Sequence, residues 1–287
     1  MHPLEPADHE AAAALFLRTY PLRQDEITAR PEQQRFAATD DKGRLIAYAA
    51  LWPFHPDGYR FDLIVAPERR RHGIGDDLLR QLGELARAAG AITLQARIDD
   101  TWAESRSFLL ARQFRETMRM HRQVLRLADA TAETGAEARL AATGITITTL
   151  GAETRRDPAC WTRFRDLSHA ASEGWPDPDP RPGPPSLDDT DVVRRRVEAL
   201  PGGVEDCFLA VHDGEYVGFS GPLGTAVHPA HRGCGIATAL KTRVVCAARD
   251  RGLETLTTAS GNPAMLHINE RLGYRRTSTE IRFVKPL

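Results

Sequence analysis

The sequence contains one pattern twice, and this repeat constrains the fold more than any other feature. Val65–Gly75 and Val227–Ala237 share a valine, a proline, an arginine, a glycine and an isoleucine at identical spacing. The same register continues without a gap through five further pairs: Leu78 with Leu240, Ala86 with Ala248, Arg87 with Arg249, Gly90 with Gly252, and Leu94 with Leu256. A repeat this long indicates a duplicated domain rather than the short unit of a solenoid.

The duplication divides the chain into two domains. A length of 287 residues suits two domains of ordinary size. We assign residues 1–127 to the first copy and residues 144–287 to the second. Residues 128–143 are mostly small and polar, with little periodicity, and are expected to be a linker. Ile145–Leu150 alternates with period two and predicts the first strand of the second copy. The matching strand of the first copy should be short or missing.

Charge and cysteine content narrow the class of protein. The formal net charge is −1, which gives no reason to expect a nucleic acid or a membrane surface as partner. We find no apolar run that could span a bilayer and no secretory signal pattern. The four cysteines lack the spacing of a zinc site. We expect a cytoplasmic protein without a metal, either a monomer or a homodimer.

Strands and helices are mixed within each copy. In the second copy, residues 160–171, 191–200 and 262–274 are expected to be helical, and Asp213-Gly214 should form the turn of a hairpin. The prolines of residues 172–189 exclude regular structure. The first copy repeats much of this order. We therefore predict an α/β (α+β layered) fold in each copy, with a mixed, mostly antiparallel central sheet flanked by helices.

The repeated motif R-x-x-G-x-G/A lies between a strand and a helix. The first turn of a helix has backbone N–H groups without internal partners, and the helix dipole favours an anion there. A pyrophosphate fits such a loop. A Rossmann dinucleotide site is an alternative, since Gly233 and Gly235 could begin its glycine pattern, but the first copy has Arg71 where the first glycine should be. An ordinary glycine turn is another alternative, against which the duplication argues.

Arg70–Gly75 and Arg232–Ala237 resemble the coenzyme A loop of the GNAT superfamily of N-acetyltransferases, and Asn262–Tyr274 resembles the helix that closes the same site. The resemblance implies two tandem GNAT-like domains and acyl transfer from acetyl-CoA. It also implies that the pantetheine arm pairs with the strand before each loop. The implied coenzyme A residues are Leu63, Val65, Arg70, Arg71, His72, Gly73, Ile74, Gly75 and Asp76 in the first copy, and Thr225, Ala226, Val227, Arg232, Gly233, Cys234, Gly235, Ile236, Ala237, Thr238 and Asn262 in the second.

The two copies differ in ways that bear on catalysis. The first copy has the more cationic loop, Arg69–His72, which favours it for holding a pyrophosphate. The closing helix favours the second copy, because the first has Gln113 where the second has Gly273. We expect the second copy to be catalytic, with residues 172–189 placed to cover an acceptor. The first copy would bind coenzyme A, or would be a degenerate GNAT domain that only supports the pair.

Candidate catalytic residues each have a structural alternative. His228 could relay a proton as a base, or be a surface histidine at a strand end. Glu173 could reach the acceptor from its loop, or be a solvated carboxylate. Asp62, the one acid on either central strand, is either buried with a shifted pKa or on the solvent face. The family often has a tyrosine that protonates the leaving thiolate, and here Asn269 occupies that position, with Leu109 in the first copy. Water, or unaided departure of the thiolate, would then serve.

The resemblance therefore predicts an acetyl-CoA-dependent N-acetyltransferase that modifies a primary amine of a small-molecule acceptor by direct attack. A non-catalytic coenzyme A-binding or scaffold protein is the alternative, because the tyrosine is missing from both copies. An acyltransferase using a longer acyl-CoA also stays open.

Overall fold

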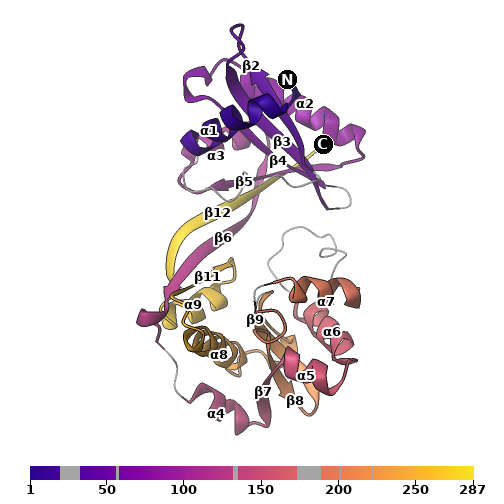
Figure 1. Cartoon of the computed structure of the whole chain (residues 1–287), viewed down its shortest axis with the longest axis vertical. Coiled ribbons are helices and arrows are strands. Elements are labelled where there is room, and N and C mark those ends of the chain that lie inside the picture. Colours follow the sequence, from indigo (N-terminus) through magenta and orange to yellow (C-terminus); the bar gives the residue numbers. More distant parts are fainter. Residues whose placement is uncertain (20–32, 56–57, 132–134, 173–188, 201, 222) are drawn as a thin grey trace. The chain divides into compact units, whose positions relative to one another are not determined.

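The computed structural model describes residues 1–19, 33–55, 58–131, 135–172, 189–200, 202–221 and 223–287 (Figure 1). The strands are β1 (His2–Pro3), β2 (Gln34–Thr39), β3 (Leu45–His55), β4 (Gly58–Val65), β5 (Thr93–Asp99), β6 (Arg115–Arg126), β7 (Ile145–Thr149), β8 (Phe208–His212), β9 (Glu215–Gly221), β10 (Gly224–Val227), β11 (Thr255–Ser260) and β12 (Arg275–Pro286). The α-helices are α1 (His9–Thr19), α2 (Ile74–Ala88), α3 (Ala103–Ala111), α4 (Ala136–Ala141), α5 (Leu150–Arg156), α6 (Cys160–Ser172), α7 (Thr190–Glu198), α8 (Ile236–Asp250) and α9 (Pro263–Arg271).

The chain forms two compact units. Unit 1 comprises Met1–Thr117 together with Ile281–Leu287, and unit 2 comprises Met118–Glu280. The strand order is β1-β2-β3-β4-β5-β12-β6-β11 in one sheet and β10-β9-β8-β7 in the other. Most strand pairs are antiparallel, and β4 pairs with β5 in parallel. The predicted α/β fold, with mixed sheets flanked by helices, is confirmed.

In unit 1 the sheet lies between α1 and α2. Leu82 and Ala86 of the amphipathic helix α2 are fully buried against one face of the sheet, in a core that also contains Phe61 of β4. On the other face, Phe16 of α1 packs with Ile64 of β4. Because side chains alternate along a strand, β4 contributes to both cores and occupies the middle of the unit.

In unit 2 the four-stranded sheet is likewise covered on both faces. Phe164 of α6 belongs to the core cluster on one face, and Leu240 of α8 to the cluster on the other. Gly218 of β9 permits the close approach of α8, because a Cβ atom there would lie 2.8 Å from Cγ2 of Ile236. A larger residue at this position would push away the helix that follows the second repeated loop.

Several local expectations are confirmed, and one short helix was not foreseen. β1 is two residues long, as the weak N-terminal pattern indicates. Asp213 and Gly214 both have positive φ, 50° and 84°, as a type I′ hairpin turn requires. Within residues 128–143, Ala136 and Leu140 of α4 are buried against the core that contains α8. Such a short helix forms through tertiary packing, which periodicity over a few small residues does not reveal.

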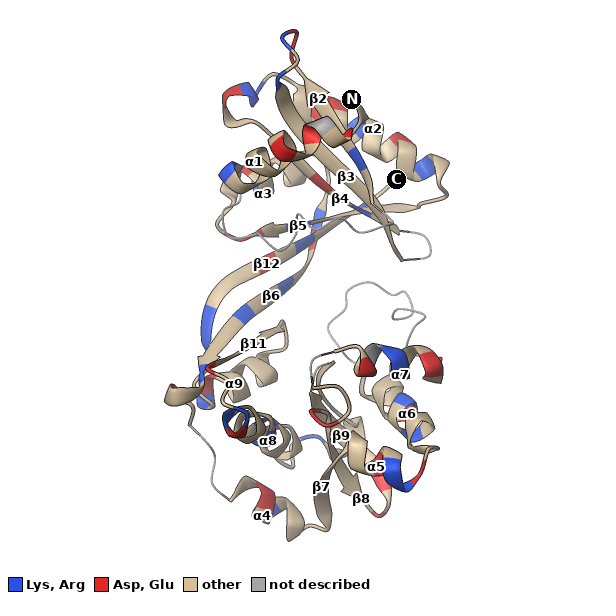
Figure 2. Ribbon diagram, viewed as in Figure 1, with Lys and Arg blue, Asp and Glu red and all other residues tan. Residues whose placement is uncertain are grey.

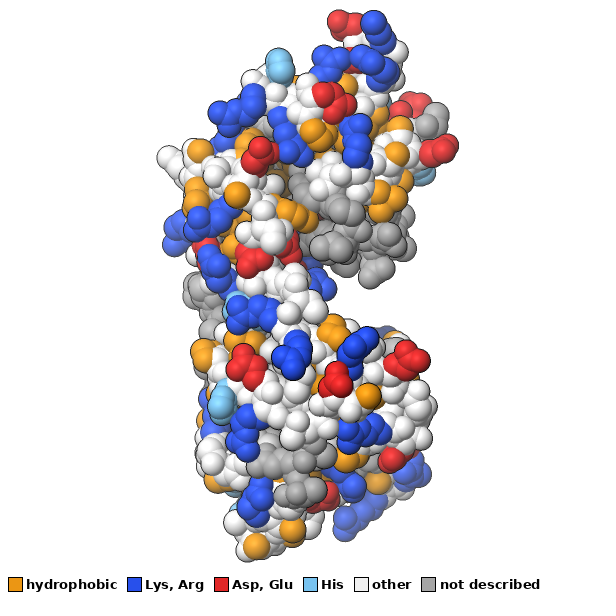
Figure 3. Space-filling model, turned by 90° about the vertical axis from the view of Figure 1, so that its left-hand side faces the viewer, with side chains coloured by type: hydrophobic (Ala, Val, Ile, Leu, Met, Phe, Trp, Pro, Cys, Tyr) orange, Lys and Arg blue, Asp and Glu red, His pale blue; other side chains and the backbone are white. Residues whose placement is uncertain are grey.

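The surface mixes both signs of charge. Helices α2 and α7 each carry acidic and basic residues (Figure 2). The face shown in Figure 3 likewise has blue and red side chains interspersed. None of the helices in the described part of the chain combines the length and apolar character needed to cross a bilayer.

Candidate functional site

The two repeated loops have the same backbone conformation. In unit 1, φ is 64° at Arg71 and 81° at Gly73, and in unit 2 it is 81° at Gly233 and 83° at Gly235. The second residue of each pair is the N-cap of the following helix, α2 or α8. Positive φ favours glycine, so Arg71 adopts at an energetic cost the conformation that Gly233 adopts freely.

The motif arginine braces each loop against the strand before it. Nε of Arg70 donates to the carbonyl oxygen of Val65 at 3.3 Å, and Nε of Arg232 donates to that of Val227 at 3.2 Å. Both carbonyls end the strand that leads into the loop. The duplication therefore preserves a side-chain contact as well as a backbone shape.

Backbone N–H groups remain available in both loops. Within the described chain, no hydrogen bond is found from the N–H groups of residues 71–75 or of residues 233–238. The helix is first closed by Asp76 N donating to Gly73 O at 3.0 Å in unit 1, and by Ala239 N donating to Gly235 O at 3.1 Å in unit 2. Unpaired N–H groups at the positive end of a helix dipole can bind an anion such as a pyrophosphate.

A cavity of about 810 Å³ lies beside the loop of unit 1. Its walls include Phe61 and Ile98 from one core and Phe16 and Ile64 from the other. Because these residues belong to opposite faces of the sheet, the cavity passes between strands β4 and β5. The remaining lining residues are Asp62, Leu63, Val65, Arg69, Arg70, Arg71, Gly73, Gly75, Asp76, Ala96, Arg97, Trp102, Ala103, Glu104, Ser105, Ser107, Phe108, Leu109, Ala111 and Arg112.

An ion pair links α2 to Arg112, the residue that follows α3, in the wall of this cavity. Arg112 donates from Nε and Nη2 to both carboxylate oxygens of Asp76, at 2.5 and 2.6 Å, and its guanidinium stacks 3.7 Å from the centre of the Phe108 ring. The hydrogen bonds from Arg112 lower the pKa of Asp76. The first turn of α2 therefore carries an acid whose charge is balanced by a bound guanidinium.

The second loop has a simpler surrounding. Thr238 replaces the acid of the first turn, so no acidic residue lies in the first turn of α8. Strand β10, which carries Thr225, Ala226 and Val227, lies at one edge of the four-stranded sheet. Asn262 caps α9, where its side-chain oxygen accepts from the N–H groups of Ala264 and Met265 at 2.9 and 3.3 Å.

The structure describes two of the three predicted catalytic residues, His228 and Asn269, and each bonds to a different partner. His228 is half-buried, and its Nδ1 accepts from Ala230 N at 3.3 Å. Asn269 is fully buried; its Nδ2 donates to Gln123 Oε1 at 2.7 Å, and its Oδ1 has no partner among the described residues. Glu173 lies outside the described residues. The catalytic roles of all three stay predictions.

Sequence reasoning missed most of the cavity wall in unit 1. Asp62, one of the candidate residues, lines the cavity, and so do Arg97, Trp102 and Phe16, which the motifs do not mark. Arg97 could have been found from the repeat register, which pairs it with Ala259 and so marks a charged residue in one copy alone.

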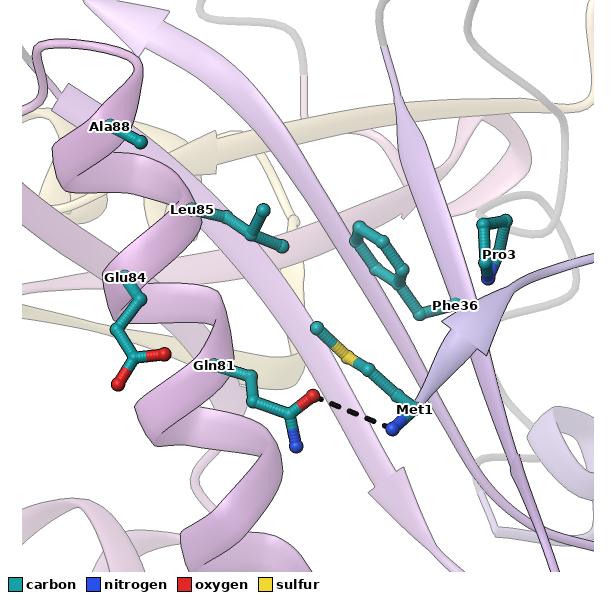
Figure 4. A pocket seen from close by; sticks show the side chains of 7 residues that line it. All are labelled: Met1, Pro3, Phe36, Gln81, Glu84, Leu85 and Ala88. Atoms are coloured by element: carbon teal, nitrogen blue, oxygen red, sulfur yellow. Dashed lines mark hydrogen bonds between the residues drawn. The ribbon is translucent and has the colours of Figure 1, made fainter.

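A second cavity in unit 1, of about 440 Å³, lies away from the loop (Figure 4). Apolar side chains of β1, β2 and the later turns of α2 make most of its wall, and the terminal ammonium group of Met1 donates to Gln81 Oε1 at 3.4 Å. The lining residues are Met1, Pro3, Phe36, Gln81, Glu84, Leu85 and Ala88.

Comparison with known proteins agrees with the geometry. The profile of the acetyltransferase (GNAT) family matches residues 4–108 and 164–274. A mycothiol acetyltransferase of Thermomonospora curvata is 28% identical over 274 residues, which are 91% of this chain and 85% of that protein. A GCN5-related N-acetyltransferase from Sphaerobacter thermophilus shares the fold at a TM-score of 0.73 and 18% identity, covering 99% of this chain and 94% of that one. A tandem GNAT protein from the clavulanic acid biosynthesis pathway has a TM-score of 0.63 and 21% identity, covering 99% and 97%.

Proposed function

Because this chain belongs to the acetyltransferase (GNAT) family, we propose that it transfers the acetyl group of acetyl-CoA to a primary amine of a small-molecule acceptor. At the level of the family, the protein is an N-acetyltransferase. In direct attack, the neutral amine adds to the thioester carbonyl, the C–N bond forms and the C–S bond breaks. A base must first take a proton, since an alkylamine is mostly protonated at pH 7.

The observation that carries this proposal is the shared geometry of the two loops. Both present N–H groups at a helix N-terminus that bond to none of the described residues, and in both loops two residues have positive φ. In unit 1, these groups and Arg71 would hold the pyrophosphate. In unit 2, they would do so without a neighbouring arginine at the matching position, which is Gly233.

The choice of catalytic copy stays a prediction. The Asn262 cap and the Gly273 terminus of the closing helix favour the second copy, where Gly273 has a φ of 96°. The cavity between diverging strands favours the first. A coenzyme A-binding scaffold is a second candidate function, because Asn269 is buried and bonded where the family often has a catalytic tyrosine.

Mass-detected acetyl transfer to a panel of amines tests the proposal. We expect an acetylated product in the presence of acetyl-CoA, and a parallel series with propionyl-CoA and butyryl-CoA defines the acyl length. Binding of acetyl-CoA without transfer to any amine would support the scaffold instead. Failure to bind acetyl-CoA at all would contradict both functions.

We also propose that the protein acts in the cytoplasm. Cys160, Cys207, Cys234 and Cys246 are all free thiols, and two of them are buried. Unpaired cysteines are typical of proteins that work in a reducing compartment.

A further inference from the structure

An acidic and a basic residue lie at the same level on β4 and β5, just beyond the point where the two strands stop pairing. The strands pair in parallel from Gly58 with Thr93 to Arg60 with Gln95, and the described residues form no further pairs between them. Two residues beyond the last pair, Asp62 of β4 and Arg97 of β5 therefore stand at the same level. Since side chains alternate along a strand, both belong to the face opposite the core that contains Phe61, Ala96 and Ile98.

Both side chains also line the cavity that reaches the loop of unit 1. Asp62 and Arg97 form its wall together with Gly73 and Gly75 of the loop. Both are partly exposed rather than buried. An acid and a guanidinium thus line the space that a thioester would reach from the loop along β4.

The second copy has neither group. In the register of the repeat, Asp62 corresponds to Gly224 and Arg97 to Ala259. The loops of the two copies have the same geometry, but the strands beside them have different side chains at these two positions. The charged pair is therefore specific to unit 1.

Resting on the proposed function, we propose that unit 1 has an acceptor site of its own, which takes an amine that also carries a carboxylate, such as an α-amino acid. Asp62 receives the ammonium group of the acceptor, and Arg97 binds its carboxylate through the paired N–H groups of the guanidinium, a geometry that matches a carboxylate. Phe16, which lines the same cavity and packs on the face that carries Asp62 and Arg97, encloses the acceptor side chain.

The transfer step balances with these groups. Asp62 takes one proton from the ammonium group and releases it to solvent. The freed amine forms a C–N bond with the thioester carbonyl carbon, and the C–S bond breaks. The second proton lost by the nitrogen goes to the departing thiolate, so the products are the N-acetyl amino acid, coenzyme A thiol and one proton.

The test uses the full chain, the twenty protein amino acids and their methyl esters. We expect wild-type protein to acetylate at least one amino acid with a higher kcat/KM than its ester. Arg97→Ala should reduce that ratio at least tenfold, whereas the control Arg80→Ala, an exposed arginine of α2 outside the cavity wall, should leave it unchanged. Asp62→Asn should lower kcat at least tenfold and leave the calorimetric affinity for acetyl-CoA intact.

A binding measurement separates this site from the activity. Titration of the preferred amino acid into the coenzyme A-loaded protein should give heat with wild type and Arg80→Ala, and none with Arg97→Ala. Two results would overturn the site in unit 1 while the proposed function stands. One is acetyl transfer only to amines that lack a carboxylate. The other is transfer to an amino acid that survives Gly73→Asp and is lost with Gly235→Asp. The absence of transfer to every amine would instead refute the proposed function, and the site with it.

Discussion

A carboxylate at residue 235 should block binding of acetyl-CoA to the second loop, and the matching amide should not. Gly235 is the N-cap of α8 and has a φ of 83°, and a Cβ atom there would lie more than 4 Å from every described residue that is not its chain neighbour. Gly235→Asp and Gly235→Asn therefore enter without a clash. Both residue types tolerate the left-handed conformation better than most, so their conformational costs are similar, on the order of 1 kcal/mol. Their difference in binding isolates the added charge.

The size of that difference follows from Coulomb's law. A carboxylate about 5 Å from a phosphate charge, at an effective dielectric constant of about 20, is repelled by roughly 3 kcal/mol. Screening by salt reduces this figure. We therefore expect the Asp variant to bind at the second loop roughly 100-fold more weakly than the Asn variant, where about 1.4 kcal/mol corresponds to tenfold.

Isothermal titration calorimetry at low and high salt provides the assay. The difference between the two variants should narrow as salt rises, and the same pair of substitutions at Gly73 should behave alike at the first loop. Urea unfolding of each variant checks that the fold is intact. Equal affinities for the Asp and Asn variants would refute the idea that a phosphate lies against this helix terminus.

Three further predictions concern stability, each measured by urea unfolding. Gly233→Ala and the control Gly43→Ala, both at positive φ with open space around the new Cβ, should each lower the free energy of unfolding by about 1 kcal/mol, and equal stability to wild type would contradict the assigned φ. Asn262→Ala should cost about 1 kcal/mol because it removes two capping hydrogen bonds, whereas Asn262→Ser should restore most of the loss. Burial lowers the pKa of Lys241 to about 8, below its ordinary 10.5. Between these two pH values the unfolded chain binds more protons than the folded one, so the free energy of unfolding should rise with pH. Lys241→Met should raise the free energy of unfolding at pH 7 by up to roughly 3 kcal/mol, and a gain that did not shrink by pH 10 would exclude the buried ammonium group as its cause.

Much of the fold and of the candidate site could be predicted from the repeat, because two copies of one pattern can be aligned within the chain. It located both loops, and Arg70 and Arg232 make the same contact in each. Glycines at the loops and the Asn262 cap have strong local preferences, so sequence reveals them. The prediction did not foresee that Arg71 would adopt the conformation of Gly233, since local propensity argues against an arginine with positive φ.

The cavity in unit 1 escaped prediction for a different physical reason. It depends on where the pairing of β4 and β5 ends, which is a long-range property of the sheet. The pattern of its strand leaves Asp62 either buried or facing solvent. The position of β5 decides that Asp62 lines a cavity, which Arg97 also lines. The hydrogen bond of Asn269 likewise has a partner, Gln123, that lies far away in the sequence.

The most direct test of the account is the stoichiometry of acetyl-CoA binding, because the central claim is that both loops hold a pyrophosphate on backbone N–H groups. Calorimetry on protein freed of bound nucleotide should give two sites per chain for wild type, one for Gly73→Asp, one for Gly235→Asp and none for the double variant. Absence of binding to the wild type at millimolar acetyl-CoA, or binding unchanged in the double variant, would contradict the claim.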